Sequence, residues 1–267
     1  MKDITVGIIG GTGGMGRWFA DLLQKEGYPV HVWGRKSAMT INELTVLCNV
    51  IVIAVPISAT AAMIEKVGAL VSEGSLLMDL TSLKKEPVEL MLANSWADVI
   101  GCHPLFGPGV GDASGGNVIL CKARGRKWIG WLRNILEKNG LVVTEETPEE
   151  HDKIMAIVQV LNHLNTISLG LTLAETGISL GKISKYTTPI FQTKLRIIKK
   201  IFTESPGLYA DIIANNPDTD KILKLYEKSL ADIRKILKSG NAAKLKGALA
   251  QAAKTLFYTK LLSKNKL

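Results

Sequence analysis

Cysteine is scarce in this chain, and its pattern excludes two classes of protein. Cys48, Cys102 and Cys121 are an odd number in 267 residues, without CxxC spacing. Disulfide-stapled domains carry an even, dense set of cysteines, and zinc knuckles need closely spaced pairs. We therefore expect neither a disulfide framework nor a structural zinc site.

Long apolar runs are also missing. No uninterrupted stretch approaches the roughly 18 residues of a membrane-spanning helix, and the N-terminus lacks the basic, apolar and small-residue order of a signal peptide. The chain is nevertheless 46% hydrophobic and 21% charged, which allows a sizeable core. The sequence predicts a folded cytoplasmic protein with no membrane partner.

Acidic residues are outnumbered only towards the C-terminus. The formal net charge is +9, and residues 182–267 hold 18 Lys or Arg against 6 Asp or Glu. Basic regions can bind nucleic acid, but no RNA-recognition, helix-turn-helix or zinc-finger pattern accompanies this one. We therefore expect solvated basic helix faces, a few lysines for an anionic substrate, and no nucleic-acid partner.

Strands and helices alternate through the first half of the chain. Apolar β-rich runs at 4–9, 30–33, 50–55, 76–80, 99–101 and 118–120 are separated by stretches with helical spacing. Continuous apolar strands are typical of a parallel sheet that helices cover on both faces. The pattern predicts an α/β, Rossmann-like domain over 1–146, doubly wound with a mostly parallel sheet.

The pattern changes to helices alone near residue 146. Thr147 can be an N-cap, Pro148 the first helical residue, and Glu150 its partner in a capping box. A long helix is predicted to about Glu175 and another over 189–202, with breaks near residues 206, 217 and 240. We therefore predict an all-α domain over 147–267.

A glycine-rich turn follows the first strand and opens a helix. Its residues are Gly11, Thr12, Gly13, Gly14, Met15 and Gly16. Glycines at this spacing allow a tight turn, close approach to a pyrophosphate, and close helix–strand packing. The turn predicts a dinucleotide site, and Val55-Pro56, which ends a later strand, is a candidate for the same site.

An acidic residue is missing where the second strand ends. A carboxylate at that point would bind the ribose 2′-hydroxyl of NAD, but the sequence there is Gly34-Arg35-Lys36. Arg35 and Lys36 offer cations to a 2′-phosphate. We predict NADP as the cofactor, with NAD possible if Arg35 only stacks on adenine.

Histidine is rare, and only one copy lies on a Gly/Pro-bracketed loop. His103 lies within Gly101-Cys102-His103-Pro104-Leu105-Phe106-Gly107-Pro108, where it can act as a neutral base beside a nicotinamide. His31 alternates with apolar residues in a strand and is interpreted as structural. His151 and His163 are twelve residues apart in one helix, about 18 Å along its axis, so we expect no metal site.

Two of these histidines have neighbours that bear on their roles. His151 lies in the first helical turn beside Asp152, which indicates helix-end chemistry or interdomain packing. His163 lies in an apolar stretch with Gln159 one turn earlier on the same face. A lone histidine on such a face is usually a core residue, so the helix by itself leaves both interpretations open.

Several separate motifs, in order from about residue 4 to 216, resemble the prephenate dehydrogenase family. They are the glycine-rich turn, Val55-Pro56-Ile57, Asp79-x-x-Ser82-x-Lys84, the His103 loop, His151-Asp152-x-x-Met155-Ala156-x-x-Gln159-x-x-x-His163, Thr188-Pro189-Ile190 and Leu208-Tyr209-Ala210-Asp211-Ile212.

This resemblance implies a Rossmann domain and a helical domain that builds a homodimer, with the active site between them. The reaction it implies is oxidation at C4 of a cyclohexadienol by a nicotinamide cofactor, with loss of the ring carboxylate as CO₂, in tyrosine biosynthesis. His103 would hydrogen-bond the C4 hydroxyl, and Ser82 would help to hold both that hydroxyl and His103. His163 would line the substrate pocket, with Gln159 among the substrate-binding residues.

The chain departs from the family pattern where an arginine grips the ring carboxylate. Lys200 occupies that position, after Lys199 where glycine is usual, and Gln192 occupies a second frequent arginine position. Lysine keeps the charge without the bidentate geometry. We expect Lys200 and Gln192 to contact the substrate, although Lys199-Lys200 could equally be a solvated helix face.

Other functions share parts of this pattern. Arogenate could replace prephenate, and the nucleotide half also resembles deazaflavin-dependent NADP oxidoreductases, which need no His-Pro loop. A non-catalytic NADP sensor would have little use for His103 together with Ser82 and His163. We expect a monofunctional dehydrogenase, without the chorismate mutase or regulatory domain of some relatives.

Overall fold

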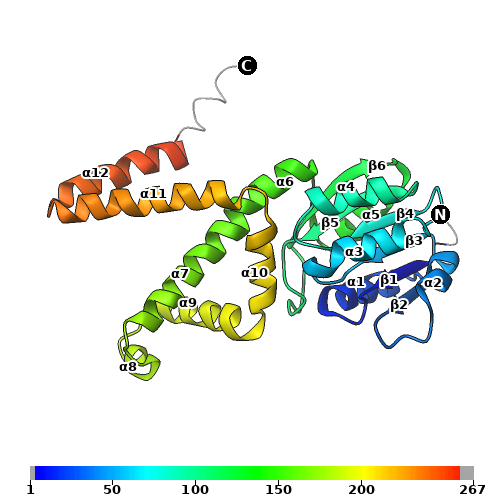
Figure 1. Ribbon diagram of the computed structural model, residues 1–267, viewed down its shortest axis with the longest axis horizontal. Coiled ribbons are helices and arrows are strands. Elements are labelled where there is room, and N and C mark those ends of the chain that lie inside the picture. Colours follow the sequence, from blue (N-terminus) through cyan, green and yellow to red (C-terminus); the bar gives the residue numbers. More distant parts are fainter. Residues whose placement is uncertain (1–3, 259–267) are drawn as a thin grey trace, which may run out of the picture. The chain divides into compact units, whose positions relative to one another are not determined.

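The computed structural model describes residues 4–258, and the chain divides into two compact units, residues 1–219 and 220–267. The first unit contains a seven-stranded sheet, its covering helices, and the helices that follow to residue 215 (Figure 1). In the second unit, the described elements are all helical. The domain boundary near residue 146 stays a prediction.

The sheet is mostly parallel, as predicted. Its order is β2-β1-β3-β4-β5-β6-β7; β1 to β5 are parallel, β6 is antiparallel to β5, and β7 is parallel to β6. The strands are β1 (Val6–Ile9), β2 (Val30–Trp33), β3 (Val50–Ile53), β4 (Leu76–Asp79), β5 (Asp98–Pro104), β6 (Asn117–Arg124) and β7 (Val142–Glu145). β7 was not predicted, because this largely exposed edge strand lacks the apolar run of the inner strands.

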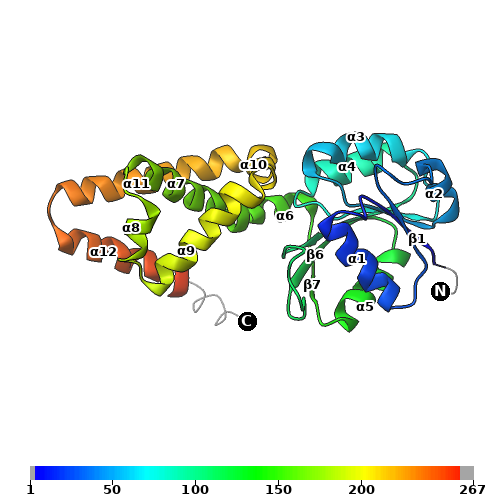
Figure 2. The same ribbon diagram turned by 90° about the horizontal axis from the view of Figure 1, so that it is seen from below.

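Helices cover both faces of the sheet (Figure 2). They are α1 (Gly14–Lys25), α2 (Ile41–Leu47), α3 (Ile57–Gly68), α4 (Lys85–Asn94) and α5 (Lys127–Lys138). On one face, Phe19 of α1 and Trp128 of α5 are fully buried in one core cluster. On the other face, Leu44, Ile64 and Met91 of α2, α3 and α4 fill a second cluster. The doubly wound fold is therefore confirmed.

One continuous helix follows the sheet, as predicted, over residues 148–175. It consists of α6 (Pro148–Met155), the π-helical segment η1 (Ala156–Leu161) and α7 (Asn162–Glu175). Thr147 caps it, since the Thr147 hydroxyl accepts from the Glu150 amide at 3.2 Å. The capping box is only half formed, because the Thr147 N–H donates to Glu146 and the Glu150 carboxylate pairs with Lys153.

Four further elements complete the helical part of the first unit. They are α8 (Leu180–Ser184), α9 (Pro189–Lys199), the π-helical η2 (Lys200–Glu204) and α10 (Pro206–Asn215). α9 packs along α7, and α10 packs against η1, α7 and the sheet-covering helix α3 (Figure 1). α10 therefore brings the helical part against the carboxyl side of β3, which α3 follows.

The second unit is helical, as the sequence predicted for this region. Its elements are α11 (Thr219–Lys238), α12 (Ala242–Ala253) and η3 (Lys254–Tyr258). Gly240, with a φ of +62°, lies in the turn between α11 and α12. The predicted break at this glycine is therefore confirmed.

The long helix Pro148–Glu175 is the one described helix with the length and composition to cross a membrane. Its most apolar 18-residue window has a mean hydropathy of 1.4, and 22% of that window is buried. One helix of this kind is weak evidence for a membrane span, because core helices of globular proteins meet the same criterion.

A buried ion pair closes the turn between β4 and α4. The Lys84 ammonium pairs with the Asp79 carboxylate and also donates to the Cys102 carbonyl at 3.1 Å, and both side chains are fully buried. Asp79 Oδ2 also accepts from the Thr81 amide at 2.9 Å. The pair therefore ties the β4–α4 turn to β5 one residue before His103.

Removing the cation of this pair should destabilise the protein strongly. We expect Lys84→Met to lower the free energy of unfolding by about 3–5 kcal/mol, since it leaves the Asp79 carboxylate buried and unpaired. Denaturant unfolding followed by tryptophan fluorescence measures this. The matched control is Lys85→Met, an exposed neighbour, which should change it by less than about 0.5 kcal/mol. Equal effects of both variants would contradict the assignment.

Candidate active site

The turn from β1 to α1 depends on two glycines for steric reasons. Gly10 has a φ of +84°, and a Cβ on it would lie 2.4 Å from the Ala54 carbonyl oxygen. A Cβ on Gly16 would lie 2.5 Å from the Gly10 carbonyl oxygen, so α1 can approach the turn only without a side chain there. Gly10 was not singled out from the sequence, although its place directly after an apolar strand is a usable signal.

The N-terminus of α1 is free to bind an anion. Its N-cap is Gly13, which supplies no side-chain cap, and no acidic residue lies in its first turn. Backbone N–H groups at such an end favour phosphate. The turn also lies where β1 has β2 on one side and β3 on the other, which is the switch point at which doubly wound sheets bind ligands. A dinucleotide pyrophosphate fits this place.

Arg35 and Lys36 lie beside the same turn. Together with Thr12, Gly34 and Ser37 they line a cavity of about 380 Å³, which we call the Arg35 cavity. A Cβ on Gly34 would lie 2.8 Å from the Thr12 hydroxyl. The Arg35 cavity therefore has two exposed cations and no carboxylate among its described lining residues.

A second cavity, of about 430 Å³, brings together most of the residues predicted for the site; we call it the His103 cavity. Its lining includes these predicted residues: Gly13, Gly14, Met15, Val55, Pro56, Ser82, His103, Gln159, His163 and Lys200. They come from the glycine turn, the end of β3, the β4–α4 turn, β5, the long helix and η2. Gly11 and Gly16 form the turn behind the cavity.

Two neighbouring candidates lie outside this cavity. Gln192 is exposed and donates to the Thr187 hydroxyl at 3.1 Å, and it is not among the residues that line the His103 cavity. Lys199 does not line it either, whereas Lys200 does. The structure therefore gives Gln192 no contact with the cavity and separates the two lysines, because only one of them faces it.

Two of the three π-helical segments in the described residues, η1 and η2, contribute a side chain to this cavity. Gln159 lies within η1 and Lys200 opens η2. A π-helical turn is uncommon and often marks a functional site, because its extra residue changes the direction of nearby side chains. None of the three π-helical segments was predicted from the sequence, which shows only continuous helical spacing.

His103 lies on β5 and is 3% exposed. Burial lowers its pKa well below 6.5, and the nearby His151 and Lys84 lower it further. The ring is therefore neutral at pH 7. Its Nδ1 lies 2.9 Å from His151 Nε2, and its Nε2 lies 3.4 Å from Gln159 Nε2.

His151 and Asp152 continue the chain of hydrogen bonds from His103. His151 Nδ1 lies 2.7 Å from Asp152 Oδ1, which accepts from the Lys84 amide at 2.8 Å, while Oδ2 accepts from the Lys85 amide at 2.9 Å. The sequence indicated helix-end chemistry or packing for His151 and missed its pairing with His103. The adjacent His151-Asp152 pair was a usable signal for a hydrogen-bonded histidine, but the sequence does not show that His103 is its partner.

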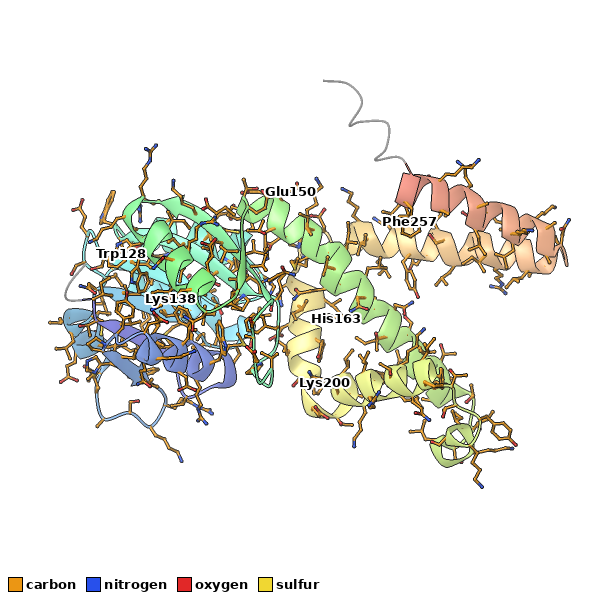
Figure 3. All side chains as sticks on the ribbon, turned by 180° about the vertical axis from the view of Figure 1, so that it is seen from behind. Trp128, Lys138, Glu150, His163, Lys200 and Phe257 are labelled. Carbon is orange, nitrogen blue, oxygen red and sulfur yellow. The ribbon has the colours of Figure 1, made fainter. Side chains whose placement is uncertain are left out.

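His163 lies on α7 across the cavity from the strands. Its ring meets the Tyr209 ring edge-on, with 4.8 Å between centroids, and burial lowers its pKa. Figure 3 labels His163 on the long helix and Lys200 at the start of η2. Tyr209, Leu208 and Ile212 of α10 also line the cavity; they were part of a recognised motif but not predicted as site residues.

The charge of the His103 cavity suits an anion. Among its described lining residues there is no Asp or Glu, and Lys200 supplies an ammonium group. Within residues 4–258, no cluster of three or more His, Cys, Asp or Glu side chains could hold a metal ion. The site therefore combines a buried neutral imidazole, a cation and a nucleotide turn.

Two family models match this chain. The nucleotide-binding domain of prephenate dehydrogenase matches residues 21–145, and the prephenate dehydrogenase dimerization domain matches residues 147–251. A probable arogenate/prephenate dehydrogenase of Methanocaldococcus jannaschii is 35% identical, covering 94% of this chain and 61% of the relative. The T-protein of Enterobacter agglomerans is 31% identical, covering 88% and 62%. The chain thus spans about three fifths of the length of these curated relatives.

Solved structures share the fold. A prephenate dehydrogenase from A. aeolicus, in complex with hydroxyphenyl propionate and NAD⁺, has a TM-score of 0.78 at 21% identity and covers 96% of this chain and 98% of its own. Synechocystis arogenate dehydrogenase has a TM-score of 0.72 at 19% identity, covering 94% and 98%.

Proposed function

The chain belongs to the prephenate dehydrogenase family, and we propose that it converts prephenate to 4-hydroxyphenylpyruvate and CO₂ in tyrosine biosynthesis. The observation that carries this proposal is the buried neutral His103, which faces one cavity together with the glycine turn and Lys200. The names of the curated relatives support the same reaction.

His103 would be the base of the reaction. The hydrogen at C4 would leave as hydride for a bound nicotinamide dinucleotide. The bond to the ring carboxylate would break to release CO₂, and the electron pair of that bond would make the ring aromatic. His103 Nε2 accepts the hydrogen bond of the C4 hydroxyl as positive character develops there. Its lowered pKa keeps it unprotonated for this task at neutral pH.

The cofactor would be a nicotinamide dinucleotide, which supplies a hydride acceptor when bound. The uncapped N-terminus of α1 and the glycine turn would hold its pyrophosphate, and Val55 and Pro56 would border the nicotinamide end. Arg35 and Lys36 support NADP, because two cations and no described carboxylate line the Arg35 cavity. NAD remains a second possible cofactor.

Lys200 would bind a carboxylate of the substrate, and Ser82, Gln159 and His163 would line the substrate position. The support for Lys200 is its place in a cavity without described acidic residues. Arogenate differs from prephenate by an amine in place of the keto group and would use the same machinery; relatives with that name keep it as the second candidate. No observed contact favours a deazaflavin-type activity.

The protein would act as a cytoplasmic homodimer. Its helical part matches a dimerization-domain model, and exposed apolar side chains lie along the long helix, among them Ile157 at 55% and Leu171 at 55%. Three buried free thiols suit a reducing compartment. A light-scattering mass of a single chain at working concentration would contradict the dimer.

The first test is NADPH formation at 340 nm, with prephenate and separately with arogenate. We expect turnover that falls on the order of 10²–10⁴-fold in His103→Ala, because the base is lost. His31→Ala, a histidine of β2 outside the cavity, should keep its activity. Turnover of arogenate alone would change the substrate and keep the mechanism. NADP binding without any turnover would contradict the enzyme and favour a sensor.

Lys200→Ala should raise KM far more than it lowers kcat. Loss of a charged hydrogen bond worth about 1.5–3 kcal/mol corresponds to an increase of roughly 10–100-fold. Steady-state kinetics at saturating cofactor measures both constants. Lys199→Ala is the matched control and should leave KM unchanged, because Lys199 lies outside the cavity. An unchanged KM in Lys200→Ala would remove Lys200 from the site.

The double variant Arg35→Ala with Lys36→Ala should lose its preference for NADP. We expect the ratio of kcat/KM for NADP to that for NAD to fall about 10–100-fold, because the 2′-phosphate loses its charged partners. The double variant Arg126→Ala with Lys127→Ala is the matched control, since it removes an exposed Arg–Lys pair at α5. An equal ratio in both double variants would contradict the assignment.

A further inference from the structure

We propose that His151 and Asp152 are positioning residues that fix the tautomer of His103. They hold the His103 proton on Nδ1 and leave Nε2 unprotonated, facing the cavity. The catalytic consequence rests on the proposed function, in which His103 is the base. The tautomer itself follows from the hydrogen bonds of this chain.

The Asp152 carboxylate, which is 1% exposed, determines which nitrogen of each histidine carries a proton. A carboxylate can only accept hydrogen bonds. Both of its oxygens already do so from backbone N–H groups: Oδ1 from Lys84 N at 2.8 Å, and Oδ2 from Lys85 N at 2.9 Å. These two donors open α4, so the positive end of that helix stabilises the charge. Asp152 Oδ1 can therefore accept a hydrogen bond from His151 but cannot donate one.

His151 in turn determines which nitrogen of His103 carries a proton. Its Nδ1, 2.7 Å from Asp152 Oδ1, must carry a proton. In the neutral ring the other nitrogen then has a free lone pair. His151 Nε2 lies 2.9 Å from His103 Nδ1, so it accepts, and His103 Nδ1 carries the proton.

The far side of His103 agrees with this placement of the protons. Gln159 Nε2, an amide donor, lies 3.4 Å from His103 Nε2, which suits an unprotonated nitrogen there. The buried Gln159 Oε1 has no hydrogen-bond partner among residues 4–258. The lone pair of His103 Nε2 and this oxygen therefore lie side by side at the cavity, where a substrate hydroxyl would be bound.

The same chain of bonds stabilises the product of proton uptake. When His103 Nε2 accepts a proton, the ring keeps its Nδ1–H bond to His151, and the Asp152 carboxylate lies behind it. A carboxylate in this place stabilises an imidazolium and orients it, as in Ser-His-Asp triads. The other charges nearby, Lys84 and Asp79, pair with each other and leave Asp152 as the balancing anion.

The tautomer can be measured without turnover. We would record long-range ¹H–¹⁵N spectra of the full-length protein with ¹⁵N-labelled histidine, with His103 assigned by its absence in His103→Ala. The expected pattern is the Nδ1–H form of a neutral ring. The Nε2–H form in the wild-type protein would overturn the proposal.

Asp152→Asn is the decisive variant. Asn has one oxygen for the two positions, so either Lys84 N or Lys85 N loses its acceptor, and the negative charge that balances a protonated His103 is removed. We expect a fall in kcat on the order of 10²–10⁴-fold, with unchanged Kd for NADP. Glu149→Gln, which removes a carboxylate charge at an exposed site of α6, should alter neither. An unchanged kcat in folded Asp152→Asn would overturn the proposal.

A second pair of variants covers the case in which Asp152→Asn does not fold. His151→Gln keeps an oxygen that can accept from His103 Nδ1, whereas His151→Phe keeps the ring and removes the acceptor. We expect His151→Gln to keep at least ten times the kcat of His151→Phe, at equal NADP affinity. Equal kcat values would overturn the relay.

Failure of this proposal is distinguishable from failure of the proposed function. Expected spectra without turnover of prephenate or arogenate would contradict the function and support the tautomer assignment. Turnover by the wild type with the same kcat in Asp152→Asn would support the function and overturn the positioning role.

Discussion

The geometry of the active site depends on the hydrogen bonds of the Asp152 carboxylate. Its two oxygens accept the amides of Lys84 and Lys85 that open α4, and it also holds His151. The backbone carbonyl of Asp152 accepts from the Asn216 side chain at 2.9 Å, just beyond α10. One residue therefore joins a helix of the sheet layer, the long helix and the end of α10. Because Asp152 is buried, each of these bonds is shielded from water and correspondingly hard to replace.

A second buried charge, Lys84, complements this contact from the sheet side. Its amide serves Asp152, while its ammonium pairs with Asp79 and holds the Cys102 carbonyl beside His103. The base on β5 is thus supported through its own strand and through the long helix at once. The cofactor turn depends on steric contacts instead: Gly16 lets α1 approach the turn, and Gly10 lets the turn approach the Ala54 carbonyl after β3. The nucleotide turn therefore needs close backbone approach, whereas the geometry of the base depends on side-chain hydrogen bonds between distant segments.

The sequence predicted the architecture well because the inner strands and the glycine turn carry local signals. Apolar runs that alternate with helical spacing predicted six strands of a mostly parallel sheet and the helices between them, and Pro148, Gly240 and the helical spacing predicted the helical part. It missed β7, whose exposed edge position removes the apolar run, and the three π-helical segments, which leave helical spacing intact. The sequence also could not show that Gln192 lies outside the His103 cavity and Lys200 lines it. Both fall in one predicted helix, and helical spacing alone does not say which of its residues face a cavity.

The sequence by itself determined the alternation of strands and helices, the dinucleotide turn and the set of polar residues available for chemistry, because each depends on neighbours within about one helical turn or strand. Only the tertiary structure decided which of these residues meet. His103 and His151 are 48 residues apart, and Asp152 and Lys84 are 68 apart. No periodicity links such positions. Their hydrogen bonds exist because α6 packs against α4 and β6, which buries His103, His151 and Asp152 side by side.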